Sequence, residues 1–226
     1  MSVVADPATT SVAAAVERTR QRIEAAGGDP ERVRILAVTK GQPASAVDAA
    51  VAAGVHQAGE SYPQELLAKA PQVVGPVRWH WIGRLQRNKV RQIASLVDLW
   101  ESIDREELAA EVARRAPGAA ILVQLNVAGA GSQGGCTPAA APALVERCRA
   151  LGLEVRGLMA IGARGAPDVV RAGFRQLRAL ADDLGLPERS MGMSGDLEAA
   201  VAEGSTEVRV GTAIFGPRGG SSAMGN

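Results

Sequence analysis

The chain has 226 residues, 46% of them apolar and 22% charged, which is ordinary material for one large globular domain or two small ones. Its 25 lysines and arginines nearly cancel its 24 acidic residues, so a net charge of +1 supplies no long-range field for a nucleic-acid binder. The N-terminal sequence lacks a basic region and its longest apolar run is VAAAV, so we expect no signal peptide, no membrane partner and a cytoplasmic protein.

Helical and strand patterns alternate along the chain. After a disordered start over residues 1–10, a helix is expected from Ser11 to Ala26, because Val12, Val16 and Ile23 recur on one face and Gly27 follows. Short β-branched runs come next, apolar without strict alternation, which is typical of strands buried on both faces. The expected strands are Val33–Val38, Val55–Ala58, Trp79–Ile82, Leu99–Ile103, Ile121–Val127, Val155–Ile161, Ser190–Met193 and Val208–Val210.

Helices are expected between these strands. The clearest are Ala44–Ala53, Pro63–Lys69, Pro138–Leu151, Asp168–Leu184 and Leu197–Glu203, with charged helices after the third and fourth strands. Eight βα units form either an open doubly wound sheet or a closed barrel, and regular repetition without a long insertion favours closure. We therefore predict the α/β class and a single-domain (β/α)8 TIM barrel over residues 11–218, followed by a flexible tail over 219–226.

In such barrels, chemistry sits at the carboxyl ends of the strands. The residues that end the strands or follow them are unusually polar: Thr39, Lys40, Glu60, Ser61, His80, Gly83, Ser102, Asp104, Asn126, Met159, Ser194, Arg209, Gly211 and Thr212. Lys40 directly follows the apolar run Ile35-Leu36-Ala37-Val38, so its amine is expected at the barrel mouth, where desolvation lowers a lysine pKa. That is the setting of a Schiff-base lysine. The alternative is a side chain that extends into bulk water.

The last two strands end in sequences that fit an anion. Ser194-Gly195 and Gly211-Thr212 each open a helix, which offers hydroxyl groups and backbone N–H groups at the place where barrels commonly hold phosphate. Arg209 precedes Gly211 by two residues and has the same parity on its strand. Ordinary helix capping is the alternative. A lysine beside a phosphate cradle indicates pyridoxal phosphate.

Several motifs resemble a known family, the pyridoxal phosphate homeostasis proteins, which are similar to the barrel domain of alanine racemase and of fold type III decarboxylases. The resemblance covers about Ile35 to Arg218. It is carried by Ala37-Val38-Thr39-Lys40, Gly59-Glu60-Ser61-Tyr62-Pro63-Gln64-Glu65, the segment 79–89 (WHWIGRLQRNK), Gly157-Leu158-Met159-Ala160-Ile161, the segment 192–200 (GMSGDLEAA) and the segment 208–216 (VRVGTAIFG).

The resemblance implies roles for particular residues. Lys40 would carry the cofactor as a Schiff base, Ser194, Gly211 and Thr212 would hold its phosphate, Arg209 would approach the pyridine nitrogen and Met159 would pack beside the ring. Ser61 stands where the family generally has Asn, near the ring. The segment 129–135 is neutral and glycine-rich, where the family usually has an acidic residue and a Ser-Lys pair, so no role is carried over to it.

The same resemblance implies storage and delivery of the cofactor without efficient turnover. A permanently positive arginine opposes protonation of the pyridine ring and weakens the cofactor as an electron sink. In the racemase, moreover, a base on the opposite face comes from a second domain, which this chain is not expected to carry. Transfer to apo-enzymes that need pyridoxal phosphate, and a monomer or weak dimer, are the corresponding expectations for partners.

His80 has two interpretations. It lies in a strand between Trp79 and Trp81, and is either a core histidine bonded to the backbone or a residue near the cofactor. Cys136 and Cys148 fit no zinc spacing and no secreted disulfide framework, so we expect two incidental thiols.

The charged side chains elsewhere in the sequence are interpreted mainly as solvent-exposed surface residues. Arg84, Arg87 and Arg91, with Lys89 nearby, form either a solvated helix face or a patch for a phosphate group or another acidic partner. No aromatic residues interleave with them, so stacking on bases is not supported. The acidic pairs at 106–107 and 182–183 are interpreted as helix surface, because no histidine accompanies either pair, and no metal is expected.

Two rival functions stay open at this point. One is a pyridoxal phosphate-dependent amino-acid racemase or decarboxylase that uses the same lysine, for which Tyr62 is the one available phenol. The other is an aldolase-type barrel in which Lys40 attacks the carbonyl of a sugar phosphate.

Overall fold

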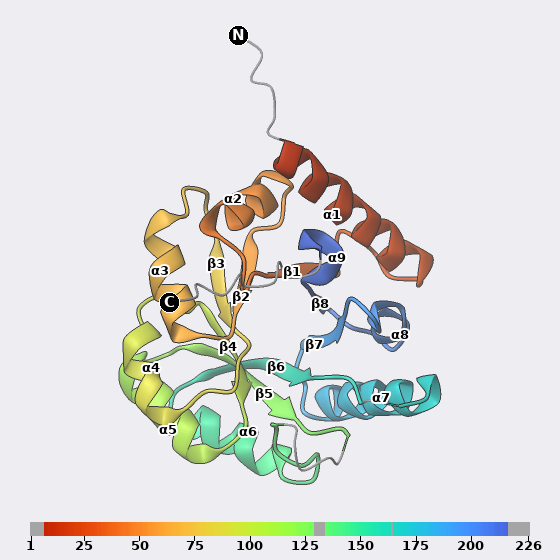
Figure 1. The fold of residues 1–226 in the computed structure, drawn as a ribbon. Helices are drawn as coiled ribbons and strands as arrows, with labels where there is room; N and C mark the ends of the chain where they lie inside the picture. The colour runs from red at the N-terminus through yellow and green to blue at the C-terminus, as the bar shows by residue number, and fades with distance from the viewer. Residues whose placement is uncertain (1–6, 129–133, 164, 217–226) are drawn as a thin grey trace, which may run out of the picture.

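The computed structural model describes residues 7–128, 134–163 and 165–216, and it forms a closed barrel of eight parallel strands in chain order. The ring is visible in Figure 1, with helices outside it. The strands are β1 (Arg34–Val38), β2 (Gln57–Glu60), β3 (Arg78–Trp81), β4 (Leu99–Ile103), β5 (Ala120–Leu125), β6 (Glu154–Ala160), β7 (Glu188–Met193) and β8 (Glu207–Val210). The predicted (β/α)8 architecture is confirmed.

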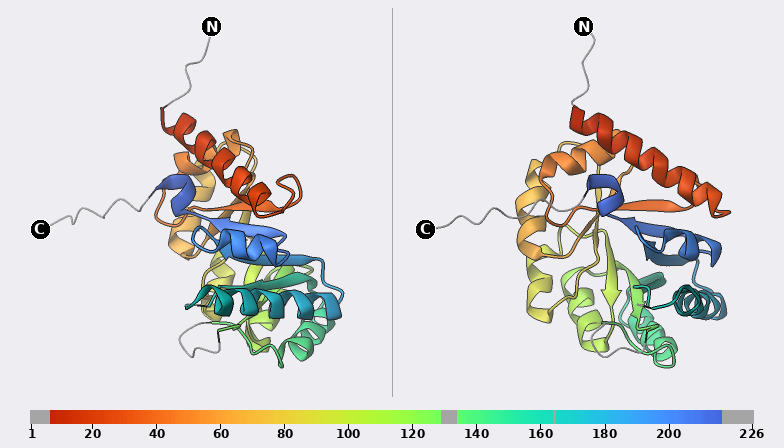
Figure 2. Two further views of the ribbon diagram at one scale, coloured as in Figure 1. Left: turned by 90° about the vertical axis from the view of Figure 1, so that its right-hand side faces the viewer. Right: turned by 45° about the vertical axis from the view of Figure 1, so that its right-hand side comes forward.

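Crossover helices cover the barrel on all sides, as the views in Figure 2 show. They are α2 (Ala44–Ala52), α3 (Pro63–Lys69) with the 3-10 turn η1 (Ala70–Gln72), α4 (Arg87–Ile93), α5 (Glu106–Arg115), α6 (Ala141–Ala150), α7 (Pro167–Asp183), α8 (Leu197–Ala202) and α9 (Thr212–Phe215), and α1 (Pro7–Ala25) precedes the barrel. None of the helices in the described ranges has the length and apolar character needed to cross a bilayer.

The start of α1 differs from the expectation. The helix begins at Pro7 rather than Ser11, so the predicted disorder of residues 1–10 is wrong for 7–10. Proline is favoured at the first helical position, because its missing N–H has no helical partner there and its φ is already helical. Residues 1–6 and the predicted tail over 219–226 lie outside the described residues.

The second strand also differs, because it begins at Gln57 and runs to Glu60 instead of covering Val55–Ala58. Its register is set by both neighbours: Ala58 pairs with Ala37 of β1, and Glu60 pairs with Trp81 of β3. The apolar Val55 is buried against helices before the strand begins. Local apolar character therefore marked a buried residue here and not the strand itself.

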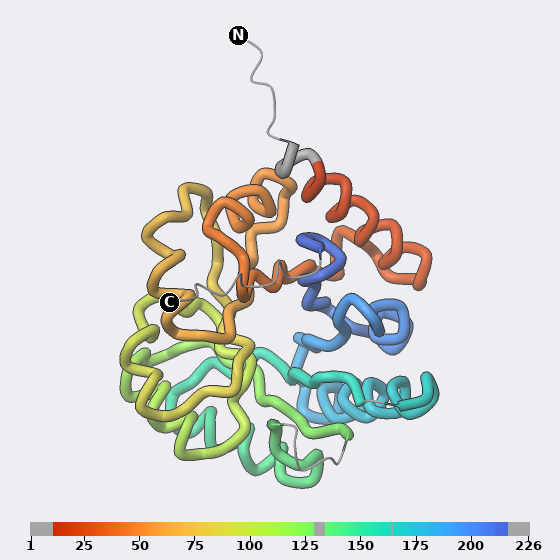
Figure 3. The backbone as a smooth tube through the Cα atoms, in the orientation of Figure 1, coloured from red at the N-terminus to blue at the C-terminus, as the bar shows by residue number. Residues whose placement is uncertain are grey.

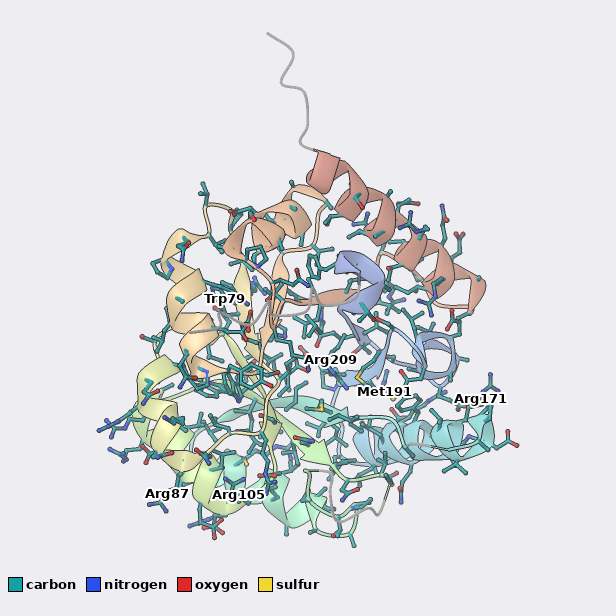
Figure 4. All side chains as sticks on the ribbon, viewed as in Figure 1. Trp79, Arg87, Arg105, Arg171, Met191 and Arg209 are labelled. Atoms are coloured by element: carbon teal, nitrogen blue, oxygen red, sulfur yellow. The ribbon has the colours of Figure 1, made fainter. Side chains whose placement is uncertain are left out.

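Alternate side chains along each strand point either into the barrel lumen or outward to the helices. In β8, Val208 and Val210 pack outward in a cluster with Val12 and Val16 of α1, whereas Arg209 points into the barrel lumen, near the centre of Figure 4. A smaller lumen cluster contains Leu99, Leu122 and Met159. The barrel interior is thus filled by side chains, partly polar ones, as in other barrels of this size.

Closure of the barrel brings the two ends of the chain together. β1 pairs with β8, with Ala37 opposite Val210, and α1 packs beside α2, α8 and α9. Figure 3 shows the N-terminal helix in red next to the C-terminal turn in blue. Arg22 of α1 also donates hydrogen bonds to Glu198 of α8 and to the carbonyl oxygen of Ser194. Lys40 follows β1 and Gly211 follows β8, so the two residues lie at the ends of adjacent strands.

Candidate functional site

Lys40, Gly211 and Thr212 line one small cavity, of about 40 Å³, where β1 and β8 end. Val38, Gln42 and Gly216 complete its lining. Lys40 reaches this position because β1 is a buried apolar strand that ends at Val38, and Gly41 then turns the chain with a φ of 73°. Lys40 and the Gly-Thr turn, 171 positions apart in the sequence, therefore line one space.

Ser194 joins this region through α9. Its hydroxyl accepts a hydrogen bond from the backbone N–H of Ala213 at 3.4 Å, which attaches the turn after β7 to the turn after β8. The carbonyl of Ser194 is in turn held by Arg22 at 2.9 Å. The three residues predicted to hold a phosphate, Ser194, Gly211 and Thr212, are therefore gathered at one corner of the barrel mouth.

Arg209 lies deeper in the lumen and is fixed on two neighbouring strands. One terminal nitrogen donates to the carbonyl oxygen (2.7 Å) and hydroxyl (2.8 Å) of Ser190, and the other donates to the carbonyl of Ala160 (2.7 Å). Met159, the residue before Ala160, is buried in the lumen cluster. Arg209 and Met159 thus lie within the same barrel interior, one layer below the turn at Gly211.

A charged network continues from Arg209 toward the amino ends of the strands. Ser190 donates to Glu101 at 2.6 Å, and Glu101 lies 2.7 Å from Nδ1 of His80, whose other carboxylate neighbour is Glu207 at 3.8 Å. All of these side chains are buried. Three of them, His80, Glu101 and Glu207, approach a metal-ligand spacing, with ligand atoms within 4.8 Å of one another. The positive charges of Arg209 and of Arg34, which is 3.3 Å from Glu207, oppose a cation there.

The pKa values in this network are shifted by burial and by the neighbouring charges. Burial alone would lower the pKa of His80, but the bond to Glu101 and the charges of Glu207 and Glu101 outweigh it and raise that pKa. Burial raises the pKa of Glu207 to about 7, with the charge of Glu101 adding to the effect. Burial would raise the pKa of Glu101 as well, yet its bond to His80 holds it below the ordinary value. A proton held between His80 and the two carboxylates is the consistent state.

His80 is not brought to the Lys40 cavity. It lines a different cavity at the amino ends of the strands together with Arg34, Arg78 and Glu188. A position of His80 near the cofactor ring therefore stays a prediction, and its observed partner is a carboxylate rather than the backbone group expected for a core histidine. The physical reason is the tilt and closure of the barrel, which turn His80 toward β4 and β8.

Ser61 is likewise not among the residues of the Lys40 cavity. It lines a groove on the far side of the β2 turn, with Tyr62, Arg84 and Lys89. Its backbone is also pressed against Gly83, where a Cβ atom would meet the Ser61 carbonyl oxygen at 2.5 Å. Gly83 is thus required for the close approach of the turns after β2 and β3.

A buried lysine next to the site escaped the sequence reasoning. Lys69 of α3 donates to the carbonyl oxygen of Thr39 (2.6 Å), to Glu60 (2.7 Å) and to Glu65 (2.8 Å). Glu65 also accepts the backbone N–H of Gly41 at 2.6 Å. The network therefore holds the backbone on both sides of Lys40, at the carbonyl of Thr39 and at the N–H of Gly41. The spacing of Glu65 and Lys69, four residues apart on a predicted helix, is the sequence signal that could have identified this pair.

Glu60 at the centre of this network is fully buried. Its other contact is the hydroxyl of Thr39 at 2.6 Å, and one of its carboxylate oxygens has no hydrogen-bond partner among the described residues. Burial raises the pKa of Glu60, against the lowering effects of Lys69 and Thr39. A buried carboxylate with a single cation beside it depends strongly on that cation.

The remaining candidates behave as structural residues. Burial raises the pKa of Cys136 to about 11 and that of Cys148 to about 12, so neither is a reactive thiolate. Asp182 pairs with Arg178 and Arg189, and Glu106 pairs with Arg147, which places both acidic pairs in surface ion pairs. The exposed Arg87 and Arg91 fit the solvated helix face of α4, whereas Arg84 and Lys89 line the groove beside Ser61.

Comparison with known proteins gives a consistent picture. The family described as alanine racemase, N-terminal domain, matches residues 12–219. A relative from Pseudomonas aeruginosa, named pyridoxal phosphate homeostasis protein, is 43% identical over 227 aligned residues, which cover 96% of this chain and 97% of the relative.

Two solved structures share this architecture. A protein of unknown function from Bifidobacterium adolescentis superposes with a TM-score of 0.86 at 37% identity, over 95% of this chain and 98% of the other. PipY of Synechococcus elongatus, solved with PLP bound, superposes with a TM-score of 0.75 at 33% identity, over 88% of this chain and all of the other (100%).

Proposed function

Because the chain belongs to the pyridoxal phosphate homeostasis protein family, we propose that it holds pyridoxal 5′-phosphate as a Schiff base on Lys40 and serves as a cytoplasmic carrier of that cofactor. The observation that carries the proposal is the shared cavity of Lys40, Gly211 and Thr212. The relatives support it, since one is named for pyridoxal phosphate homeostasis and another, PipY, was solved with PLP bound.

The residues present fit the cofactor. The cavity of about 40 Å³ is too small for a whole cofactor molecule, whose sites usually measure 300–1,000 Å³, so we place the phosphate end there. Ser194, Gly211 and Thr212 would hold that phosphate, and Lys40 would supply the amine that replaces the aldehyde oxygen of the cofactor, with loss of water. Ser61 and His80 line other cavities, so neither would contact the phosphate in this arrangement.

Arg209 would face the ring nitrogen, with Met159 beside the ring. The terminal nitrogens of Arg209 donate to Ser190 and Ala160, which leaves its Nε–H and the second N–H of the nitrogen bonded to Ala160 available among the described contacts. A cation at the ring nitrogen disfavours its protonation and reduces the electron-withdrawing chemistry that the cofactor supplies when bound. This supports a carrier over an efficient catalyst.

The position of Tyr62 gives further support. A racemase needs a second acid or base opposite the lysine. Tyr62, the phenol that a racemase would recruit, lies in the separate groove and is 55% exposed.

Lysine labelling tests the proposal, because the chain has only three lysines: Lys40, Lys69 and Lys89. Mixing the protein with pyridoxal 5′-phosphate should produce a yellow absorbance, and borohydride should then fix one cofactor at Lys40, identified by peptide mapping. Lys40→Ala should abolish the label, while Lys89→Ala, the matched control, should keep it. Equal labelling of the Lys40→Ala protein would overturn the assignment.

Two further measurements separate the rival functions. Deuterium exchange from solvent into the α-position of amino acids at enzyme-like rates would favour the racemase or decarboxylase over the carrier. Borohydride labelling that requires a sugar phosphate, and leaves no retained colour, would favour the aldolase. Delivery is tested directly by incubating the loaded protein with a pyridoxal phosphate-dependent apo-enzyme and measuring the recovery of its activity in the presence of a carbonyl trap.

A further inference from the structure

A groove of about 610 Å³ lies beside the barrel mouth and is distinct from the Lys40 cavity. One wall is the turn after β2 with the start of α3, residues 61–64. The other is the turn after β3 with α4, residues 84–86 and Lys89, and Trp81 and Arg105 complete the lining. Arg105 lies on the α4–α5 side of the barrel in Figure 4.

Both walls come from motifs that the cofactor proposal leaves unused. The segments 59–65 and 79–89 are two of the sequence motifs on which the family resemblance rests, yet neither contributes a residue to the Lys40 cavity. The walls are also fixed against each other, because Gly83 contacts the backbone of Ser61 so closely that a Cβ would lie 2.5–2.6 Å from it. The groove is therefore preformed by rigid turns.

The groove carries positive charge and no negative charge. Arg84, Lys89 and Arg105 line it, and no acidic residue does. Arg105 is held by the carbonyl oxygen of Leu85 at 3.0 Å and by Asp104. Arg84 and Lys89 form no ion pair with any other residue in the described ranges, in a protein whose arginines are often paired. Arg84 and Lys89 therefore bring two cations to one groove without a paired carboxylate among the described residues, which favours an anionic ligand.

Two aromatic residues add to this character. The ring of Tyr62 is 55% exposed at the groove, which leaves an apolar face available for a planar molecule. Trp81 is buried beside the groove, and its indole N–H has no acceptor among the described residues.

We propose that this groove is a second, non-covalent site for a small phosphate ester with a planar ring. Arg84 and Lys89 bind the phosphate, and Tyr62 packs against the ring. The volume lies within the usual range for small-molecule sites. Binding at this site depends on the charge and shape of the groove and does not require the amine of Lys40. Phosphorylated ring compounds that lack an aldehyde should therefore bind there as well.

The test uses the fact that Tyr62 is the only tyrosine of the chain. Incorporation of 3-fluorotyrosine gives a single ¹⁹F resonance that reports on the groove. Lys40 is first blocked by borohydride reduction with stoichiometric pyridoxal 5′-phosphate, and the blocked protein is titrated with pyridoxine 5′-phosphate, with inorganic phosphate and with pyridoxine. We expect a saturable shift with pyridoxine 5′-phosphate, a weaker response to inorganic phosphate, and none with pyridoxine.

The matched variants decide the result. Arg84→Gln with Lys89→Gln should weaken binding of pyridoxine 5′-phosphate by about tenfold or more, since it removes two charge-assisted contacts. Arg87→Gln with Arg91→Gln changes the net charge equally, at two exposed positions of α4 outside the groove, and should leave the affinity within about twofold. A resonance that does not move, or equal weakening by both pairs, overturns the groove site.

Failure of the cofactor proposal would look different. If Lys40 cannot be labelled, the carrier function is wrong, and the same titrations on the unblocked protein still decide the groove, because they depend on the Tyr62 resonance and on Arg84 and Lys89. Binding of inorganic phosphate and pyridoxine 5′-phosphate with equal affinity would mean that the ring is not recognised, and would overturn the assigned ligand class.

Discussion

The ammonium group of Lys69 lies 2.6 Å from the carbonyl oxygen of Thr39, the residue that precedes Lys40. The same ammonium binds Glu60 and Glu65, and Glu65 holds the backbone N–H of Gly41. A buried cation on α3 therefore fixes the backbone on both sides of the proposed cofactor lysine. Its contribution is to position Lys40, and it has no contact with the Lys40 cavity itself.

Replacement of Lys69 by methionine should strongly destabilise the protein. The change leaves the buried Glu60 without its cation and removes one of two donors to the Thr39 carbonyl oxygen, the other being the backbone N–H of Gln42. Loss of one partner of a buried ion pair typically costs roughly 3–5 kcal/mol. Urea denaturation measures the effect as a lower midpoint. Lys89→Met, at a half-buried lysine without an ion pair, should change the midpoint little.

A double variant separates positioning from simple loss of stability. Lys69→Met combined with Glu60→Gln removes the uncompensated carboxylate, so it should recover part of the lost stability. Labelling of Lys40 by pyridoxal 5′-phosphate and borohydride should still be slower than in the parent protein, because the Thr39 carbonyl oxygen loses its bond to Lys69 and Glu65, which holds Gly41, loses its cation. A double variant that is fully stable and labels at the parental rate would show that Lys69 does not position Lys40.

The free energy of unfolding should depend on pH because Glu207 binds a proton in the folded state. Its pKa, raised by burial to about 7, means that the folded state binds a proton more tightly than the unfolded state does. That stabilisation is present below the unfolded pKa, near 4.5, and is lost as the pH rises to about 7. The raised pKa of His80 acts in the same direction at higher pH.

Comparison with Glu207→Gln isolates this effect. The free energy of unfolding of the variant should rise relative to that of the parent protein between about pH 5 and about pH 7.5, by on the order of 1–3 kcal/mol. Urea denaturation at a series of pH values gives the difference directly. A difference in the free energy of unfolding between variant and parent that is constant with pH, or that falls as the pH rises, would contradict a proton bound to Glu207 in the folded state.

Arg209→Lys should impair both stability and cofactor binding. Arginine places two separate nitrogens on Ser190 and Ala160, whereas lysine has a single terminal nitrogen, so we expect a buried acceptor on β6 or β7 to lose its donor, at a cost of about 1–3 kcal/mol. The affinity for pyridoxal 5′-phosphate, measured by absorbance titration, should fall about tenfold or more. Arg175→Lys, at an exposed pair with Glu203, serves as the control and should alter neither quantity appreciably.

Gly83→Ala should be far more disruptive than Gly195→Ala. A Cβ at Gly83 would lie 2.5 Å from the backbone oxygen of Ser61, so the turns after β2 and β3 would have to separate, whereas a Cβ at Gly195 meets nothing within 4 Å. The Tm of Gly83→Ala should fall by several degrees, with that of Gly195→Ala nearly unchanged. Similar Tm values for the two variants would mean that the contact with Ser61 is not tight.

Local patterns in the sequence were sufficient for the architecture. Eight apolar runs separated by helical segments led to the closed barrel, and the buried strand before Lys40 placed that residue at the mouth. Strand boundaries were less secure where apolar character and strand pairing disagree. β2 is the example, since Val55 is buried outside the strand whereas the buried, charged Glu60 lies within it.

The amino-acid sequence by itself determined the alternation of strands and helices and the polar residues that follow the strands, because burial of a strand or of one helix face is recorded in neighbouring residues. Only the tertiary structure decided which side chains meet. Lys69 reaches Thr39 across 30 positions, Ser190 reaches Glu101 across 89, and His80 turns to Glu101 instead of the Lys40 cavity. Barrel closure and strand register determine which residues become neighbours. A buried charge then pairs with an opposite charge or a hydrogen-bond donor among those neighbours, because an unpaired buried charge is unfavourable.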